Sequence, residues 1–315
     1  MNKNISLSII KFKQGVSKIS EFLTINHNKI EILQKGKNGT PIIFLTGMDC
    51  SFDEWYNVIE PLSKFNRVIM FHRPGLGESE IRNEVRNTQA VVNEINELML
   101  LLGILEPVLL VGHSYGGLCV QHFVKEHPKK VAGIVLVDST SVDLKDLDEL
   151  DIPVLNEDST DEIWMEKGGT YSLMNQEELR ERINPTLSKK QKQLPFDLQQ
   201  RLLNFQINPS LYKAMHSEIS NWKKDADTIK NLGEFPNVPL IVIGRDKEHN
   251  IRLGIEDGLP ESELRLFEEK WQDLIMNQIN LSQNSKLIIA QEASHSIHID
   301  RPYIIIESIT WMIKE

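Results

Sequence analysis

The sequence has little cysteine. Only Cys50 and Cys119 occur among its 315 residues, too few for the disulfide framework that stabilises small secreted domains. Two cysteines fit a reducing compartment, and we expect a cytoplasmic protein. Residues 1–18 contain lysines and scattered apolar residues but neither a continuous apolar stretch nor a small-residue cleavage site, so we interpret them as a leader arm.

Long apolar runs and an excess of positive charge are also missing. Runs such as 107–111 and 304–306 fall far short of the ~20 residues needed to cross a bilayer, so we expect no membrane span. The 35 Lys and Arg residues are outnumbered by 45 Asp and Glu residues, giving a net charge of −10. This is the wrong sign for binding phosphates by electrostatics, so nucleic acid is not an expected partner.

The composition nevertheless suits a folded enzyme. Hydrophobic residues make up 40% of the chain and charged residues 25%, values close to globular averages. The length fits one α/β core of about 220 residues interrupted by an insertion of about 100.

Short β-branched runs alternate with longer helical patterns from residue 19 onward, which is typical of a mostly parallel sheet covered by helices. Two runs joined by a short polar stretch, 19–25 and 30–35, predict an opening hairpin. Six further runs bring the expected number of strands to eight: 41–46, 67–71, 107–111, 131–137, 238–243 and 286–290. Between them, apolar residues near i, i+3 and i+4 spacing predict helices over 51–65, 87–102, 115–127, 261–281 and 302–314.

The alternation stops between residues 139 and 236, where helical patterns occur without any convincing strand. We therefore divide the chain into a first part of the core at 1–138, a helical insertion at 139–236 and a second part of the core at 237–315. The insertion opens on an acidic stretch, because residues 139–166 hold ten acids and one base. Nearly all of the net charge of the chain belongs to this stretch.

The most specific motif is Gly112-His113-Ser114-Tyr115-Gly116, a G-x-S-x-G pattern between a predicted strand and a predicted helix. A serine on such a turn is held in a strained backbone conformation, and small residues on either side let the chain pass without clashes. The turn presents Ser114 at the carboxyl edge of the sheet, near the positive end of the next helix. Ser114 is therefore a candidate nucleophile.

A serine hydroxyl is a weak nucleophile, so it needs a base that is itself oriented by an acid. Asp246 follows the predicted strand 238–243, and His295 follows the predicted strand 286–290. Both strand ends lie at the same edge of a parallel sheet. The chain thus offers a nucleophile, an acid and a base in that order.

These features together resemble the α/β-hydrolase superfamily over about residues 19–315. The resemblance implies an eight-stranded α/β-hydrolase fold with the catalytic roles on Ser114, Asp246 and His295. Two further signatures agree with it: a glycine-rich turn at 73–79 after the fourth strand, and Pro302 at seven residues beyond His295. Some members of the superfamily carry the acid after the sixth strand, which makes Asp138 the alternative, although the sequence Gly-Arg-Asp favours Asp246.

The same resemblance predicts the remaining parts of the site. The backbone N–H groups of Met48 and Tyr115 would form the oxyanion hole. Thr46 replaces the histidine that the superfamily often has in that loop. His298 is a weaker candidate for a second base, and its pairing with Asp300 is a poor match to a metal site.

The insertion between strands 6 and 7 resembles the helical cap of capped members. Such a cap would lie above the carboxyl edge of the sheet, where open α/β sheets bind ligands. Its aromatic residues either line a substrate pocket or fill the core of the cap, and Trp164 and Trp222 are the candidates for the pocket. If the acidic stretch lies near the entrance, it would favour neutral or cationic substrates.

The expected activity is serine-dependent cleavage of a carboxylic ester in a small-molecule acyl substrate. The same triad also suits an amide or peptide, a lactone or a carbon–carbon bond, and a non-catalytic binding protein that keeps the fold is a further alternative. Epoxide hydrolases and haloalkane dehalogenases resemble this fold but use an aspartate nucleophile, and position 114 is Ser. The sequence contains no nucleotide, flavin or metal motif, so we expect no cofactor.

Overall fold

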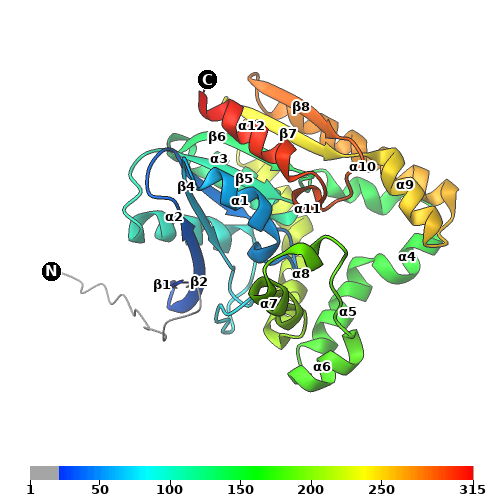
Figure 1. Ribbon diagram of the computed structural model, residues 1–315. Helices are drawn as coiled ribbons and strands as arrows, with labels where there is room; N and C mark the ends of the chain where they lie inside the picture. The colour runs from blue at the N-terminus through cyan, green and yellow to red at the C-terminus, as the bar shows by residue number, and fades with distance from the viewer. Residues whose placement is uncertain (1–20, 315) are drawn as a thin grey trace.

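A computed structural model describes residues 21–314 of the chain. The proposed leader arm at 1–18 lies outside the described residues. The described part forms a central sheet with helices on both faces, and a group of helices extends from one edge of the sheet (Figure 1).

The sheet has eight strands, as the sequence predicts, in the order β1-β2-β4-β3-β5-β6-β7-β8. Their bounds are β1 (Glu21–Ile25), β2 (Asn28–Lys35), β3 (Pro41–Leu45), β4 (Arg67–Phe71), β5 (Val108–His113), β6 (Val131–Val137), β7 (Leu240–Arg245) and β8 (Ser285–Ala290). Strand β2 runs antiparallel to both β1 and β4, and all other pairs are parallel. The parallel strands therefore all end at one edge of the sheet.

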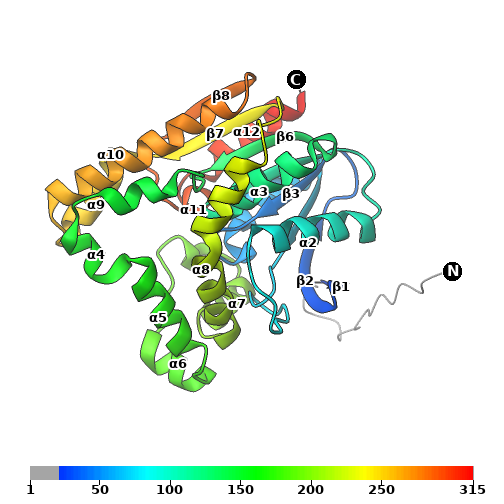
Figure 2. The same ribbon diagram turned by 180° about the vertical axis from the view of Figure 1, so that it is seen from behind.

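Two layers of helices bury the sheet, which explains why its inner strands read as continuous apolar runs. On one face lie α1 (Tyr56–Leu62), α11 (Ile297–Asp300) and α12 (Pro302–Lys314). On the other face lie α2 (Thr88–Leu101), α3 (Tyr115–Glu126) and α10 (Glu261–Asn277), as Figure 2 shows. Every residue of β5 is buried.

The segment between β6 and β7 contains helices and no strand. Its α-helices, which we call the inserted helices, are α4 (Pro153–Ser159), α5 (Asp161–Tyr171), α6 (Gln176–Ile183), α7 (Phe196–Gln206) and α8 (Pro209–Asn231). In Figures 1 and 2, α5, α6 and α7 lie beyond the edge of the sheet, whereas α8 runs back to the core. Helix α9 (Lys247–Glu256) follows β7 and was not anticipated from the sequence.

Four of the ten acids of the stretch 139–166 form ion pairs with lysines on α8 and α10. Lys223 on α8 contacts Asp148 at 2.7 Å and Asp161 at 2.9 Å, and Lys230 contacts Asp143 at 2.6 Å. Lys270 on α10 lies 3.9 Å from Asp146. Lysines on helices that pack beside this stretch thus compensate part of its negative charge.

None of the helices within residues 21–314 is both long enough and apolar enough to span a membrane.

Candidate active site

Ser114 occupies a strained turn between β5 and α3. Its backbone has φ 52° and ψ −125°, a conformation that side chains other than glycine rarely adopt. The Ser114 amide donates to Val137 O at 3.3 Å, and its carbonyl accepts from Thr140 N at 3.1 Å. The hydroxyl makes no capping bond to α3, so the turn presents it without using it structurally.

Glycines around Ser114 let three segments meet. A Cβ on Gly112 would lie 2.6 Å from Gly117 Cα, and one on Gly116 would lie 2.3 Å from Leu45 O. A Cβ on Gly117 would lie 2.0 Å from the hydroxyl oxygen of Ser139. These separations are far below ordinary contact, so the motif needs glycine for close packing as well as for the turn.

His295 lies in the loop between β8 and α11. Its carbonyl accepts a hydrogen bond from His113 Nε2 at 3.0 Å, which ties this loop to the residue before Ser114. Burial strongly lowers the pKa of His113, so the ring is neutral and Nε2 carries the proton. The His295 side chain is 38% exposed, and its ring meets that of Trp271 edge to face at 5.6 Å.

Asp138 is the carboxylate that contacts His295. It follows β6 directly, is fully buried, and accepts a 2.6 Å hydrogen bond from His295 Nδ1 through Oδ2. With Nδ1 engaged, Nε2 is the nitrogen of His295 that remains for proton transfer. The expectation that Asp246 orients this histidine is corrected by this geometry in favour of the alternative acid.

Asp246 serves a different purpose. It caps α9 by accepting from His249 N at 3.1 Å, and its other oxygen accepts from Glu292 N at 2.9 Å. Both carboxylate oxygens therefore bind backbone amides. Asp246 braces the loop that leads to His295 but does not contact the imidazole.

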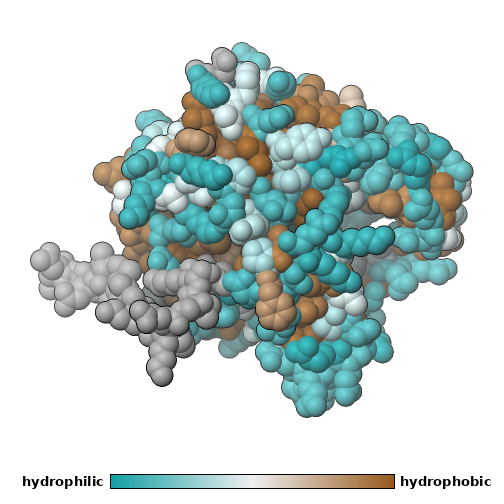
Figure 3. Space-filling view, in the orientation of Figure 1, coloured by the Kyte–Doolittle hydropathy of each residue, from teal (hydrophilic) through white to brown (hydrophobic). Residues whose placement is uncertain are grey.

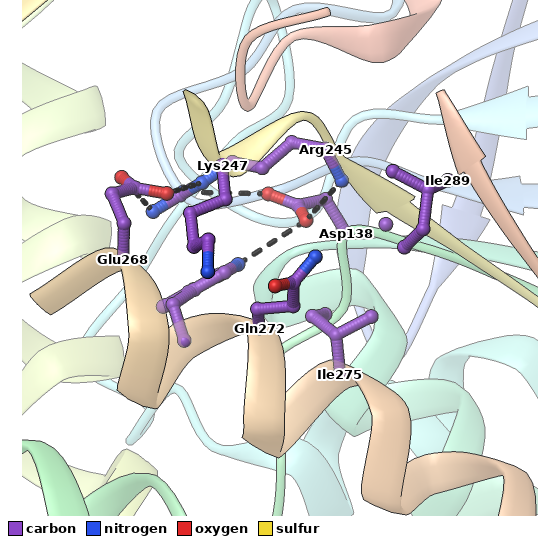
Figure 4. Close-up of a pocket in the computed structure, with 9 residues that line it drawn as sticks. Asp138, Arg245, Lys247, Glu268, Gln272, Ile275 and Ile289 are labelled. Atoms are coloured by element: carbon purple, nitrogen blue, oxygen red, sulfur yellow. Dashed lines mark hydrogen bonds and ion pairs between the residues drawn. The ribbon is translucent and has the colours of Figure 1, made fainter. Parts of the chain in front are cut away.

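Three partners keep Asp138 ionised in the interior. Its Oδ1 accepts from Arg245 N at 3.1 Å and from Trp271 Nε1 at 3.2 Å, and Arg245 Nη1 lies 3.4 Å from Oδ2. Figure 4 shows the carboxylate turned toward Arg245, which Glu268 holds through two hydrogen bonds. Burial alone would raise the pKa of Asp138, but Arg245, His295 and Trp271 together lower it to about 2.

The loop after β3 lies against the Ser114 turn. A Cβ on Gly47 would lie 3.1 Å from Ser114 Cβ, so Met48 follows a residue in contact with the candidate nucleophile. Tyr115 directly follows Ser114 as the first residue of α3. The two residues expected to supply oxyanion donors are therefore close to the serine on two different segments.

His298 is packed in the core. Its ring is fully buried and stacks on Trp55 at a centroid distance of 4.4 Å, and neither ring nitrogen forms a hydrogen bond. Burial lowers its pKa to about 3, which makes it a poor base. Within residues 21–314, no group of three or more His, Cys, Asp or Glu side chains is arranged to hold a metal ion.

A cavity of about 490 Å³ lies between the core and the inserted helices. Figure 3 shows the surface hollowed where these two parts meet. The core contributes Ser296, which follows His295, together with residues of the loop after β3. The inserted helices contribute mainly apolar and aromatic side chains: Trp164, Tyr171, Ile183, Leu202, Phe205, Leu211, Tyr212 and Met215.

Two carboxyl groups face this cavity from the core. Asp49 lines the cavity, and desolvation by the surrounding groups, followed by the negative charge of Glu54, raises its pKa to about 7. Burial likewise raises the pKa of Glu54 to about 7, although Gln191 donates a 2.8 Å hydrogen bond to it. These acids were not singled out from the sequence, because Asp49-x4-Glu54 has no motif of its own.

Of the two tryptophans proposed for the pocket, only Trp164 lines the cavity. Trp164 lines the cavity and is 38% exposed. Trp222 instead packs against the main hydrophobic core cluster, and its indole N–H donates to Asp161 at 2.9 Å. Trp222 thus holds α8 and α5 together and lies outside the cavity.

A helix-capping signal would have identified the role of Asp246. Aspartate immediately before a helix commonly accepts a hydrogen bond from an amide in the first turn, and α9 begins at Lys247. Asp138, in contrast, ends an entirely apolar run, where an ionised carboxylate requires buried partners. Those partners, Arg245 and Trp271, come from distant parts of the sequence.

Residues 40–188 match the family model described as alpha/beta hydrolase fold. The uncharacterized protein YqjL of Bacillus subtilis is 22% identical over 272 residues, covering 86% of this chain and 83% of that protein. The soluble epoxide hydrolase of Corynebacterium sp. is 29% identical over 130 residues, covering 41% of this chain and 45% of that protein. A solved thermophilic esterase from Thermogutta terrifontis is similar in structure with a TM-score of 0.65 and 16% identity, covering 94% of this chain and 98% of that one.

The chain has the α/β-hydrolase fold, and residues 40–188 match that family's model, which confirms the fold expected from the resemblance found in the sequence. The family match supports a hydrolase. The fold by itself does not select the bond that is cleaved, because activity depends on the site residues.

Proposed function

We propose that the protein is a serine hydrolase that cleaves a carboxylic ester, or a similar acyl substrate, through an acyl-enzyme on Ser114. The observation that carries the proposal is the 2.6 Å hydrogen bond between His295 Nδ1 and the buried carboxylate of Asp138. It supports a Ser114–His295–Asp138 triad, because an oriented histidine is what a serine nucleophile requires. The strained turn at Ser114 supports the same assignment.

The proposed reaction begins with proton transfer. His295 Nε2 accepts the proton of Ser114 Oγ while that oxygen bonds to the carbonyl carbon of the substrate. The carbonyl electron pair moves onto oxygen, and the N–H groups of Met48 and Tyr115 stabilise the resulting oxyanion. Asp138 stabilises the imidazolium and remains ionised.

The tetrahedral intermediate then collapses. The carbonyl re-forms, the bond to the alcohol oxygen breaks, and the alcohol leaves with the proton from His295. Water repeats the sequence with His295 as base, which releases the acid and restores Ser114. Asp138 suits its role because Arg245 and Trp271 hold it charged and fixed throughout.

We further propose that the inserted segment 139–236 is a cap domain over this site. The cavity between the core and the inserted helices supports the proposal, since its walls combine Ser296 with Trp164, Tyr171 and Tyr212. Such a mostly apolar enclosure suits an uncharged acyl or alcohol group. The substrate of this proposal is therefore a small ester with an apolar part.

An ester panel tests the proposed function. The wild type and Ser114→Ala are assayed side by side with esters that vary in acyl and alcohol parts. We expect the substitution to lower kcat by several orders of magnitude, about 10⁴-fold or more, with the fold intact. Undiminished ester hydrolysis by Ser114→Ala, or no hydrolysis by the wild type, would contradict the proposal, and turnover of an amide, lactone or carbon–carbon substrate alone would redirect it.

A further inference from the structure

A buried arginine forms hydrogen bonds to the backbone of the loop after β3. Arg73 lies just beyond β4 and is 1% exposed. Its Nη1 donates to Thr46 O at 2.7 Å, and its Nη2 donates to Gly47 O at 3.0 Å. A guanidinium presents its donors in a fixed planar fork, so two consecutive carbonyl groups of this loop are held in one orientation.

The hydrogen bond from Arg73 to Gly47 O also determines the direction in which the N–H of Met48 points. The carbonyl of Gly47 and the N–H of Met48 belong to the same planar trans peptide unit, so they point in opposite directions. Holding that oxygen against Arg73 therefore turns the Met48 N–H away from Arg73. The same loop also approaches Ser114, because a Cβ on Gly47 would lie 3.1 Å from Ser114 Cβ.

The same guanidinium also contacts the second donor residue. Arg73 Cζ lies 5.2 Å from the centroid of the Tyr115 ring. The loop and the start of α3 are in direct contact, because a Cβ on Gly116 would lie 2.6 Å from Thr46 O. Arg73 thus contacts the peptide unit that carries the Met48 N–H, through Gly47 O, and the side chain of Tyr115, whose own N–H is the second proposed donor.

Arg73 is itself anchored to an inserted helix. Its Nε donates to Glu218 Oε1 at 2.7 Å and its Nη2 to Oε2 at 3.0 Å, and Glu218 on α8 is fully buried. Burial opposes the charge of Arg73, but Glu218 raises the pKa of the guanidinium above its ordinary value. A charged pair at this depth is stable only because both partners are bonded.

We propose that Arg73, held by Glu218, is a positioning residue that sets the oxyanion hole and couples the inserted helix α8 to the catalytic step. This inference rests on the proposed serine hydrolase function. A movement of α8 is transmitted through Glu218 and Arg73 to the peptide unit of Gly47 and Met48. Neither Arg73 nor Glu218 takes part in bond making.

The chain contains a second buried arginine–glutamate ion pair that serves as a control for Arg73 and Glu218. Arg86 donates to Glu94 through Nη1 at 2.6 Å and Nη2 at 2.9 Å, and the two residues are 1% and 2% exposed. No bond joins the Arg86 guanidinium to the loop after β3. Replacing Arg86 therefore removes a buried bidentate ion pair of the same kind without changing any contact of the loop after β3.

The test compares Arg73→Lys, Glu218→Gln and Arg86→Lys with the wild type. Lysine keeps the charge but loses the planar fork. Three quantities are measured: kcat and KM for an active ester, affinity for a trifluoromethyl ketone of the same shape, and thermal stability. The ketone reacts reversibly, since Ser114 Oγ adds to its carbonyl carbon, the serine proton passes to His295, and the carbonyl oxygen becomes an oxyanion.

We expect Arg73→Lys to lower kcat by about 10²-fold, the loss typical of one oxyanion donor, with KM nearly unchanged. Affinity for the ketone falls in parallel with kcat/KM, because both depend on the oxyanion. Glu218→Gln gives a smaller loss of the same kind. Arg86→Lys lowers thermal stability without changing kcat or the affinity for the ketone.

Two failures are distinguishable. If the wild type is active but Arg73→Lys keeps the wild-type kcat and ketone affinity, or loses no more than Arg86→Lys at equal loss of stability, the positioning role is wrong and the proposed function stands. If the wild type neither hydrolyses esters nor forms the ketone adduct on Ser114, the proposed function fails, and the inference fails with it.

Discussion

The imidazole of His295 is bound through Nδ1 to a carboxylate of Asp138 that lies 157 positions earlier in the chain, at 2.6 Å. The two residues meet because β6 and β8 both end at the carboxyl edge of the sheet, on either side of β7. Arg245 at the end of β7 completes the arrangement by donating its amide to Asp138. The sheet topology, rather than any local motif, thus brings acid and base together.

Asp138 and Asp246 are predicted to differ sharply on substitution by Asn. Asp138→Asn removes the charge that stabilises the imidazolium and the acceptor that fixes its tautomer, so kcat should fall by about 10⁴-fold. Asp246→Asn keeps a good helix cap, because Asn and Asp are about equal at that position. Steady-state kinetics of the two purified variants measures the difference, and an equal loss in both would contradict the assignment of the acid.

The charge of Asp138 should also appear in the pH dependence of stability. Its folded pKa is about 2, below the ordinary 3.8. A depressed pKa stabilises the fold where the group is ionised, so this contribution is present above about pH 4 and disappears as the pH falls to about 2. The difference in unfolding free energy between the wild type and Asp138→Asn should shrink by about 2 kcal/mol over that range. Urea titrations at several pH values measure it, and a difference independent of pH would argue against an ionised Asp138.

Gly116 is predicted to tolerate no side chain. A Cβ there would lie 2.3 Å from Leu45 O and 2.6 Å from Thr46 O, so Gly116→Ala forces backbone segments apart at a cost of about 1–3 kcal/mol. Because Thr46 lies in the loop after β3, which carries the proposed oxyanion donor Met48, kcat should fall as well. Gly169→Ala is the control, since the nearest atom to its Cβ is 3.9 Å away and alanine favours a helix. Thermal unfolding and ester kinetics compare the two, and equal stability of both variants would show that the packing around Gly116 is looser than described.

The cavity carboxyls are predicted to select against anionic substrates. Asp49 and Glu54 have pKa values of about 7, so they become negative as the pH rises through 7. Preference for a cationic over a matched anionic ester should therefore increase with pH, and Asp49→Asn should reduce that preference by about 1 kcal/mol, or fivefold. Asp148→Asn is the control, because Asp148 already pairs with Lys223. Equal effects of the two substitutions would assign the selection to the acidic stretch instead.

The sequence was sufficient to predict the strands and the strained turn at Ser114, because both follow from local patterns. Continuous apolar runs mark buried parallel strands, and a G-x-S-x-G motif between a strand and a helix is typical of a nucleophile turn. The acid could not be chosen in this way, since Asp138 and Asp246 both follow strands and differ only in their distant partners. Asp246 accepts hydrogen bonds from the backbone amides of His249 and Glu292, whereas Asp138 accepts one from the His295 side chain.

The ion-pair partners of charged residues could not be predicted from the sequence either. The ten acids of 139–166 suggested a field over the entrance, but lysines on α8 and α10 neutralise several of them, including Asp143, Asp148 and Asp161. The role of Arg73 depends on contacts with Gly47 and with Glu218, which lies 145 positions away. Side-chain pairing over such separations is set by tertiary packing and leaves no periodic signal.

Covalent labelling of Ser114 tests the central claim most directly. The purified protein is treated with a fluorophosphonate, whose phosphorus is attacked by an activated serine with loss of fluoride, and the modified peptide is located by mass spectrometry. We predict one label, on Ser114, that is absent from Ser114→Ala and strongly slowed in Asp138→Asn. An unlabelled wild-type protein, or a label at another residue that persists in Ser114→Ala, would contradict the account.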